Sequence, residues 1–132
     1  MRHPKALAWE AKLKTLFDAI DERMEARHGR RFRRHPARPP HGGTASREQD
    51  GLFNVGASFT AGYGSRHGAG YLVEVQVRSL DPVPPEDQRA FEDEVAALLR
   101  KRLPHVFPGR TLTVERDGKR YKIFGDLKLG RL

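Results

Sequence analysis

Residues 111–124 read TLTVERDGKRYKIF, and this stretch decides the fold class. Apolar side chains recur at every second position on both sides of Asp117-Gly118, a dipeptide typical of the type I′ turns of two-residue hairpins. With these two residues as the loop, the sequence predicts four cross-strand pairs: Arg116 with Lys119, Glu115 with Arg120, Val114 with Tyr121, and Leu112 with Ile123. The apolar pairs share one face, so the stretch predicts a tight antiparallel hairpin.

A second hairpin is expected upstream. Apolar residues alternate with polar or small ones through residues 53–62 and again through residues 71–78. A period of two gives each strand one apolar face. The glycine-rich segment FTAGYGSRHGAG, residues 59–70, joins the two runs. The pair is therefore predicted to be antiparallel, with one face covered by the rest of the protein.

Two amphipathic helices account for the remaining periodic sequence. In residues 4–28, apolar side chains such as Leu13 and Phe17 recur at steps of three and four. Residues 87–103 carry a similar apolar stripe, and Pro104 is expected to end that helix.

The predicted order is helix–strand–strand–helix–strand–strand, which indicates an α+β fold. The simplest packing is a four-stranded, mainly antiparallel sheet with two helices on one face, in a single α+β domain that spans residues 1–132. The other face would be polar and open, and it is a candidate for ligand binding or self-association. Its candidate residues are Glu74, Gln76, Arg78 and Lys122.

Composition limits the classes of function. The chain has 25 Lys and Arg against 17 Asp and Glu, a formal net charge of +8, which favours anionic partners such as RNA or DNA. No apolar run is long enough to span a membrane. The chain lacks cysteine and the apolar segment of a secretory signal. We therefore expect a cytoplasmic protein with no membrane partner.

The most concentrated basic segment is residues 29–50, GRRFRRHPARPPHGGTASREQD. Its glycines, prolines and lack of periodicity predict a loop within the domain, of a length that usually has a function. The segment is predicted to bind phosphate groups of nucleic acid. The alternatives are a solubilising linker, or a loop that docks on the protein's own acidic residues. The candidate arginines are Arg30, Arg31, Arg33, Arg34 and Arg38.

The glycine-rich segment could cradle a phosphate or form the tip of a hairpin. A dinucleotide-binding loop needs the spacing GxGxxG between a strand and a helix. Here the spacing is one residue longer and the segment leads into a strand. The sequence predicts a hairpin tip in which Arg66 and His67 support nucleic-acid binding. The candidate ligand loop consists of Gly62, Gly64, Ser65 and Gly68.

No pattern in the sequence predicts a metal site, a cofactor or catalytic residues. The six histidines lack the spacings of zinc sites, and no Ser/His/Asp arrangement has a recognisable context. The leading hypothesis is a non-enzymatic nucleic-acid-binding protein that uses the arginine-rich loop. The alternative is a structural protein that forms a homodimer through the open sheet face. A third hypothesis is a small-ligand enzyme built around Glu74 and the glycine-rich hairpin.

Overall fold

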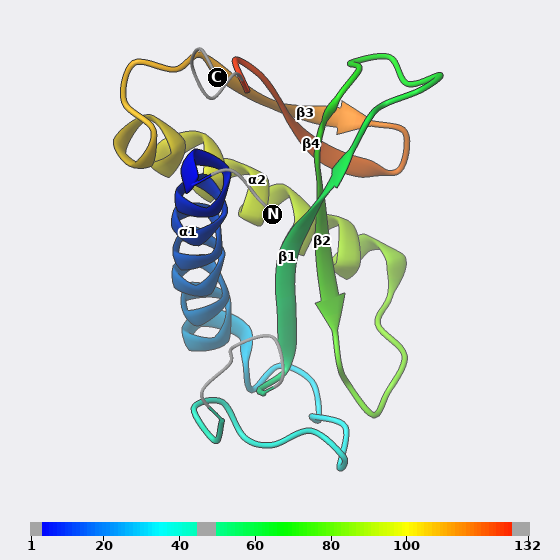
Figure 1. Cartoon of the computed structure of the whole chain (residues 1–132). Helices are drawn as coiled ribbons and strands as arrows, with labels where there is room; N and C mark the ends of the chain where they lie inside the picture. Colours follow the sequence, from blue (N-terminus) through cyan, green and yellow to red (C-terminus); the bar gives the residue numbers. More distant parts are fainter. Residues whose placement is uncertain (1–3, 45–49, 128–132) are drawn as a thin grey trace.

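The computed structural model describes residues 4–44 and 50–127, so residues 45–49 of the predicted loop lie outside the described residues. Two helices and four strands follow one another in the predicted order, which confirms the α+β fold (Figure 1). The elements are α1 (Pro4–His28), β1 (Phe53–Thr60), β2 (Gly70–Val77), α2 (Pro85–Val106), β3 (Leu112–Asp117) and β4 (Arg120–Gly125).

The four strands form one antiparallel sheet in the order β1-β2-β4-β3. The long β1–β2 hairpin runs in register from Phe53 opposite Val77 to Thr60 opposite Gly70. The two hairpins meet in the middle of the sheet, where β2 pairs with the central part of β4. Strands β1 and β3 are therefore the edges.

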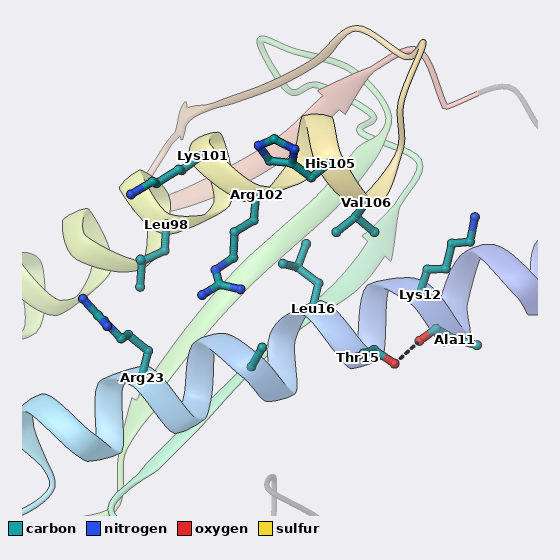
Figure 2. Close-up of a pocket in the computed structure, with 11 residues that line it drawn as sticks. Ala11, Lys12, Thr15, Leu16, Arg23, Leu98, Lys101, Arg102, His105 and Val106 are labelled. Atoms are coloured by element: carbon teal, nitrogen blue, oxygen red, sulfur yellow. Dashed lines mark hydrogen bonds between the residues drawn. The ribbon is translucent and has the colours of Figure 1, made fainter.

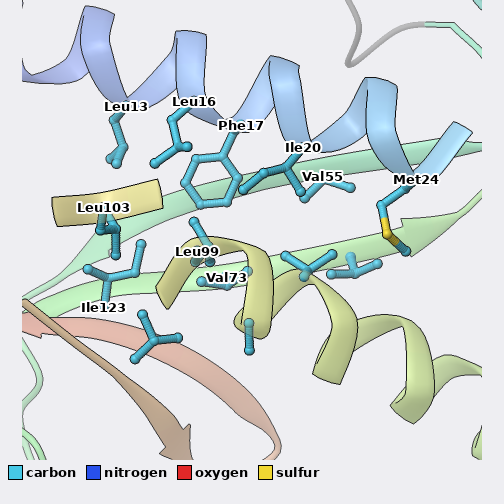
Figure 3. Close-up of a cluster of buried hydrophobic side chains, with 14 of the residues drawn as sticks. Leu13, Leu16, Phe17, Ile20, Met24, Val55, Val73, Leu99, Leu103 and Ile123 are labelled. Carbon is cyan, nitrogen blue, oxygen red and sulfur yellow. The ribbon is translucent and has the colours of Figure 1, made fainter. Parts of the chain in front are cut away.

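Both helices pack on the same face of the sheet, because alternate strand residues point toward them. Side chains from α1 and α2 meet the apolar side chains of the strands in one buried cluster (Figure 3). Ile20, Leu99 and Ile123 are each 0% exposed at its centre. The cluster draws on all six elements, so burying its apolar surface holds the two hairpins and the two helices together.

One edge of β1 pairs with no other strand of the described chain, and two carboxyl groups of α1 accept hydrogen bonds from its backbone. Glu25 Oε1 accepts a hydrogen bond from the backbone N–H of Phe53 at 2.8 Å. Asp21 Oδ2 accepts one from Val55 N–H at 3.3 Å. Because Asp21 is buried, its pKa is raised to about 8, and nearby Glu25 adds to the shift.

The β3–β4 loop is displaced by one position from the predicted one. Asp117 lies in β3 opposite Arg120, so Gly118 and Lys119 form the two-residue loop. Gly118 has φ +71°, and no non-glycine residue of the described chain has positive φ. Positive φ at the first loop residue alone is the pattern of a type II′ turn rather than the expected type I′.

The predicted register of this hairpin is therefore wrong by two residues. Since side chains alternate with a period of two, a shift of two keeps each side chain on its predicted face, and the predicted apolar face is retained. The incorrect pairs are Arg116 with Lys119, Glu115 with Arg120, Val114 with Tyr121, and Leu112 with Ile123.

Helix α2 is longer than predicted. The expectation that Pro104 ends it is wrong, because Pro104 lies inside the last turn and the helix continues to Val106. Proline has no backbone N–H, so one hydrogen bond of the helix is lost at this position. The loss is tolerated because it falls in the last turn, where few residues of the helix follow. The buried side chains of Leu103 and Phe107 hold this end in place, and Phe107 N–H bonds to Leu103 O at 2.9 Å.

Neither of the two helices in the described ranges is long and apolar enough to cross a membrane.

Candidate functional site

The arginine-rich loop is bound to the rest of the protein by ion pairs. Arg33 makes a bidentate contact with Asp81, at 2.8 and 2.6 Å, and this contact lowers the pKa of Asp81. Arg31 donates to Asp87 in the first turn of α2 at 2.9 Å. The guanidinium of Arg31 also lies 5.3 Å from the centre of the Phe91 ring. These contacts join the loop to the segment that leads into α2.

Two further arginines bond to backbone carbonyls. Arg34 Nε donates to the carbonyl of Arg38 at 2.9 Å. Arg38 in turn donates to the carbonyls of Asp50, Gly51 and Phe53, at distances from 2.8 to 3.2 Å. Partial burial lowers the pKa of Arg38. This guanidinium therefore ties the middle of the loop to the start of β1.

The loop thus matches the alternative in which it docks on the protein's own groups. Of the five candidate arginines, Arg30 alone has no hydrogen bond or ion pair with another part of the described chain. Carboxylates beside Arg31 and Arg33 already offset part of the positive charge that a phosphate would meet. The loop is therefore a weaker attractor for polyanions than its composition suggests.

The glycine-rich tip folds over a buried lysine on the open face of the sheet. Lys122 Nζ lies 2.6 Å from Asp117 Oδ2, and the Lys122 side chain is 1% exposed. The same ammonium donates to Ser65 Oγ and to Gly68 O at 2.7 Å each. Hydrogen bonds from Lys122 and Ser65 lower the pKa of Asp117 to about 2.

The tip therefore presents oxygen acceptors to an ammonium, whereas a phosphate cradle needs N–H donors. The backbone N–H groups of His67 and Gly68 are directed at Ser65 Oγ instead. His67 stacks on Phe124 with ring centres 4.3 Å apart, while Arg66 is exposed. Of the predicted ligand loop, Ser65 and Gly68 thus contact the buried lysine. Gly62, Gly64 and Gly68 supply the positive φ angles of the turn, +77°, +73° and +72°.

Three of the four candidate residues of the predicted polar face bond to neighbouring side chains of the sheet, whereas the fourth, Lys122, is buried under the tip and not exposed as predicted. Glu74 forms an ion pair with Arg120 at 2.8 Å. Gln76 Oε1 accepts hydrogen bonds from Asn54 at 3.2 Å and from Arg78 at 2.6 Å. Their geometry fits a solvated polar surface.

A basic groove between α1 and α2 was not predicted from the sequence. It lies on the outer side of the helix layer and has a volume of about 800 Å³ (Figure 2). Lys12 and Arg23 border it from α1, and Lys101, Arg102 and His105 border it from α2. Arg102 extends from α2 toward α1 across the groove.

The groove combines an apolar floor with uncompensated positive charge. Among the described residues, no acidic side chain lines it, and none of its five basic side chains forms an ion pair or hydrogen bond with another residue. Like charges held close together without counter-charges raise the local positive potential. The floor consists of Ala11, Leu16, Ala19, Leu98 and Val106.

Helical spacing is the sequence signal for this groove. One face of α2 carries residues spaced three and four positions apart, namely Leu98, Lys101, Arg102 and His105. Lys12 and Arg23 are eleven residues apart, about three helical turns, and so share one face of α1. Only the packing of the two helices brings these stripes together.

The groove, the tip and the loop lie within a region that other proteins share. A family model described as "Uncharacterised protein" matches residues 4–125, which include all six elements. The chain belongs to this family. A protein of Borreliella burgdorferi described as "Uncharacterized protein" is 37% identical over 106 residues, which make up 80% of this chain and 83% of that protein. No solved structure matches the chain.

Proposed function

We propose that this protein binds single-stranded RNA or DNA in the groove between α1 and α2. The observation that carries the proposal is the gathering of five basic side chains along one groove that no acidic side chain of the described chain lines. The proposed site therefore lies on the helices, whereas the sequence predicted a site on the arginine-rich loop.

The dimensions of the groove favour a single strand over a duplex. A volume of about 800 Å³ is that of a small-ligand site, so it can hold a few nucleotides but not the width of a double helix. The basic rim would contact phosphates, and the apolar floor would contact sugars and bases. Among the described residues, no Phe, Tyr or Trp lines the groove for base stacking, so recognition would depend mainly on the phosphates and have little sequence preference.

The test compares two triple variants that remove the same charge. Arg23→Gln, Lys101→Gln and Arg102→Gln change the groove, whereas Arg30→Gln, Arg31→Gln and Arg33→Gln change the loop. Binding of a fluorescent oligouridine or oligothymidine of about 20 nucleotides is measured by anisotropy at low salt. We expect the groove variant to bind at least about 10-fold more weakly than the wild type, and the loop variant to stay within about 3-fold of it.

Two outcomes would overturn the proposal. If the loop variant alone loses binding, the binding site is the arginine-rich loop and not the groove. Absence of binding to any oligonucleotide, together with binding of an acidic amphipathic peptide, would assign the groove to a protein partner. Circular dichroism of both variants checks that folding is intact.

The other two hypotheses from the sequence stay predictions. A homodimer through the open sheet face would have to accommodate the tip that covers Lys122. An enzyme around Glu74 would have to break its ion pair with Arg120. Sedimentation of the wild type tests the first, and ligand binding by a Glu74→Gln variant tests the second.

A further inference from the structure

A buried carboxylate oxygen on α1 has no partner. Asp21 is 1% exposed, and one of its oxygens accepts a hydrogen bond from Val55 N–H. The other oxygen, Oδ1, is buried without a hydrogen bond to any described residue. Buried polar atoms are nearly always satisfied, so an unpartnered oxygen of this kind is available to a metal ion or a hydrogen-bond donor.

Two further ligand groups lie beside the Asp21 carboxyl group. Asp21, Glu25 and His41 each place one ligand atom within 4.8 Å of those of the other two. Glu25 lies one turn after Asp21 on α1, and His41 comes from the arginine-rich loop. The absence of a side chain at Gly51 allows the backbone there to lie against Glu25, because a Cβ at this position would lie 2.2 Å from Glu25 Oε1.

We propose that Asp21, Glu25 and His41 form a binding site for a divalent transition-metal ion of the class of Mn²⁺ or Zn²⁺. Nitrogen and oxygen ligands lie about 2.0–2.2 Å from such an ion, so two ligands of one ion are at most ~4.4 Å apart. Small side-chain adjustments bring the observed separations into this range. An imidazole beside two carboxylates favours a transition metal over Mg²⁺ or Ca²⁺, which take oxygen ligands.

The charges around the three groups also favour a cation. The carboxylate of Asp50 is fully buried and lies 3.6 Å from Nδ1 of His41, where an outer carboxylate orients a metal-binding imidazole. Arg38 is the cation of the loop that interacts with Asp21, Glu25 and Asp50. Its guanidinium donates to the backbone carbonyls of Asp50, Gly51 and Phe53.

An ion can reach the site from solvent. A surface cavity of about 1180 Å³ is lined by both Glu25 and His41. Ligand positions that the protein leaves open would face a basic wall of this cavity, which consists of Arg27, Arg30, Arg31 and Arg34. Water or a small anion would complete the coordination there.

The test measures metal binding to the full chain after treatment with a chelator. Titration with Mn²⁺, followed by electron paramagnetic resonance and calorimetry, is expected to give one ion per chain. Asp21→Asn keeps an acceptor for Val55 N–H but removes the charge, and His41→Gln removes the exposed ligand. Each variant is expected to weaken binding at least ~10-fold.

His105→Gln is the matched control, since His105 lies in the groove between the helices and should leave metal binding unchanged. Thermal unfolding gives a second measurement, because Mn²⁺ should raise the Tm of the wild type and of the control but of neither site variant. Equal binding by the wild type and His41→Gln would overturn the site, as would the absence of binding at millimolar Mn²⁺ and Zn²⁺. These outcomes are independent of nucleic-acid binding, because the oligonucleotide test changes none of the three ligands.

Discussion

Lys122 and Asp117 form an ion pair of 2.6 Å on the sheet face opposite the helices, although the Lys122 side chain is 1% exposed. Water is kept from this pair by the tip of the β1–β2 hairpin, whose Ser65 and Gly68 supply the remaining acceptors. A charge removed from water needs compensation by an opposite charge and by hydrogen bonds. The glycine-rich segment therefore serves as the cover of a buried lysine, and it joins the two hairpins on their open side.

This ion pair predicts a loss of stability in acid. The pKa of Asp117 falls from 3.8 to about 2 because Lys122 and Ser65 donate hydrogen bonds to its carboxylate. A carboxylate whose pKa is lower in the folded protein stabilises the fold above its unfolded pKa. This contribution is lost as the pH falls from about 4 to about 2.

An Asp117→Asn variant should accordingly be less stable than the wild type at neutral pH. The difference in stability between the two proteins should shrink as the pH falls from about 4 to about 2. Thermal unfolding followed by circular dichroism at a series of pH values measures it. Asp126→Asn is the control, because Asp126 contacts Arg110 at 3.6 Å on the exposed surface. A constant difference between the wild type and Asp117→Asn over this range would contradict the prediction.

Gly62 and Gly64 of the tip should differ in their tolerance of a side chain. Gly62 and Gly64 both have positive φ, which costs an alanine about 1–2 kcal/mol. A Cβ at Gly62 would also lie 2.0 Å from the carbonyl oxygen of Gly68, whereas none of the protein lies within 4 Å of a Cβ at Gly64. We expect Gly62→Ala to lower the free energy of unfolding by at least ~1 kcal/mol more than Gly64→Ala, as measured by urea denaturation.

The dependence of binding on salt should report how many groove cations take part. Four Lys and Arg side chains border the groove, and a single strand releases about 0.7 counterion for each phosphate neutralised. The logarithm of the association constant should therefore fall with the logarithm of salt concentration with a slope of about −3. The triple groove variant should show a slope near −1, because one of the four charges remains. Equal slopes for the two proteins would show that the groove does not bind the phosphates.

The elements themselves could be predicted because local pattern determines them. Apolar spacing indicated both helices and both hairpins, and α1 has the predicted bounds. The β3–β4 register was missed because Asp117-Gly118 is compatible with two turn types. The choice between them coincides with the contacts that Asp117 and Lys122 make with Ser65, which lies 52 and 57 residues away along the chain.

The functional residues were harder to predict for the same reason. The sequence near Arg31 and Arg33 contains no acidic partner for either residue. Their partners Asp87 and Asp81 lie 56 and 48 residues away along the chain. The groove depends on which faces of α1 and α2 meet, and the periodicity of either helix alone does not contain that information. Charge composition indicated a polyanion partner without indicating where the unpaired charges gather.

Arg38 should contribute more to stability than Arg33, although both belong to the same loop. Arg33 contacts Asp81 on the surface, where its side chain is 71% exposed, so Arg33→Gln should change the free energy of unfolding very little. Arg38→Gln would remove donors from the carbonyls of Asp50, Gly51 and Phe53, all of which are buried residues, at a cost of about 1–3 kcal/mol. Urea denaturation gives both values, and faster tryptic cleavage within residues 29–44 should accompany the Arg38 change alone. The reverse order of the two costs would mean that the ion pair with Asp81, and not the carbonyl contacts of Arg38, holds the loop.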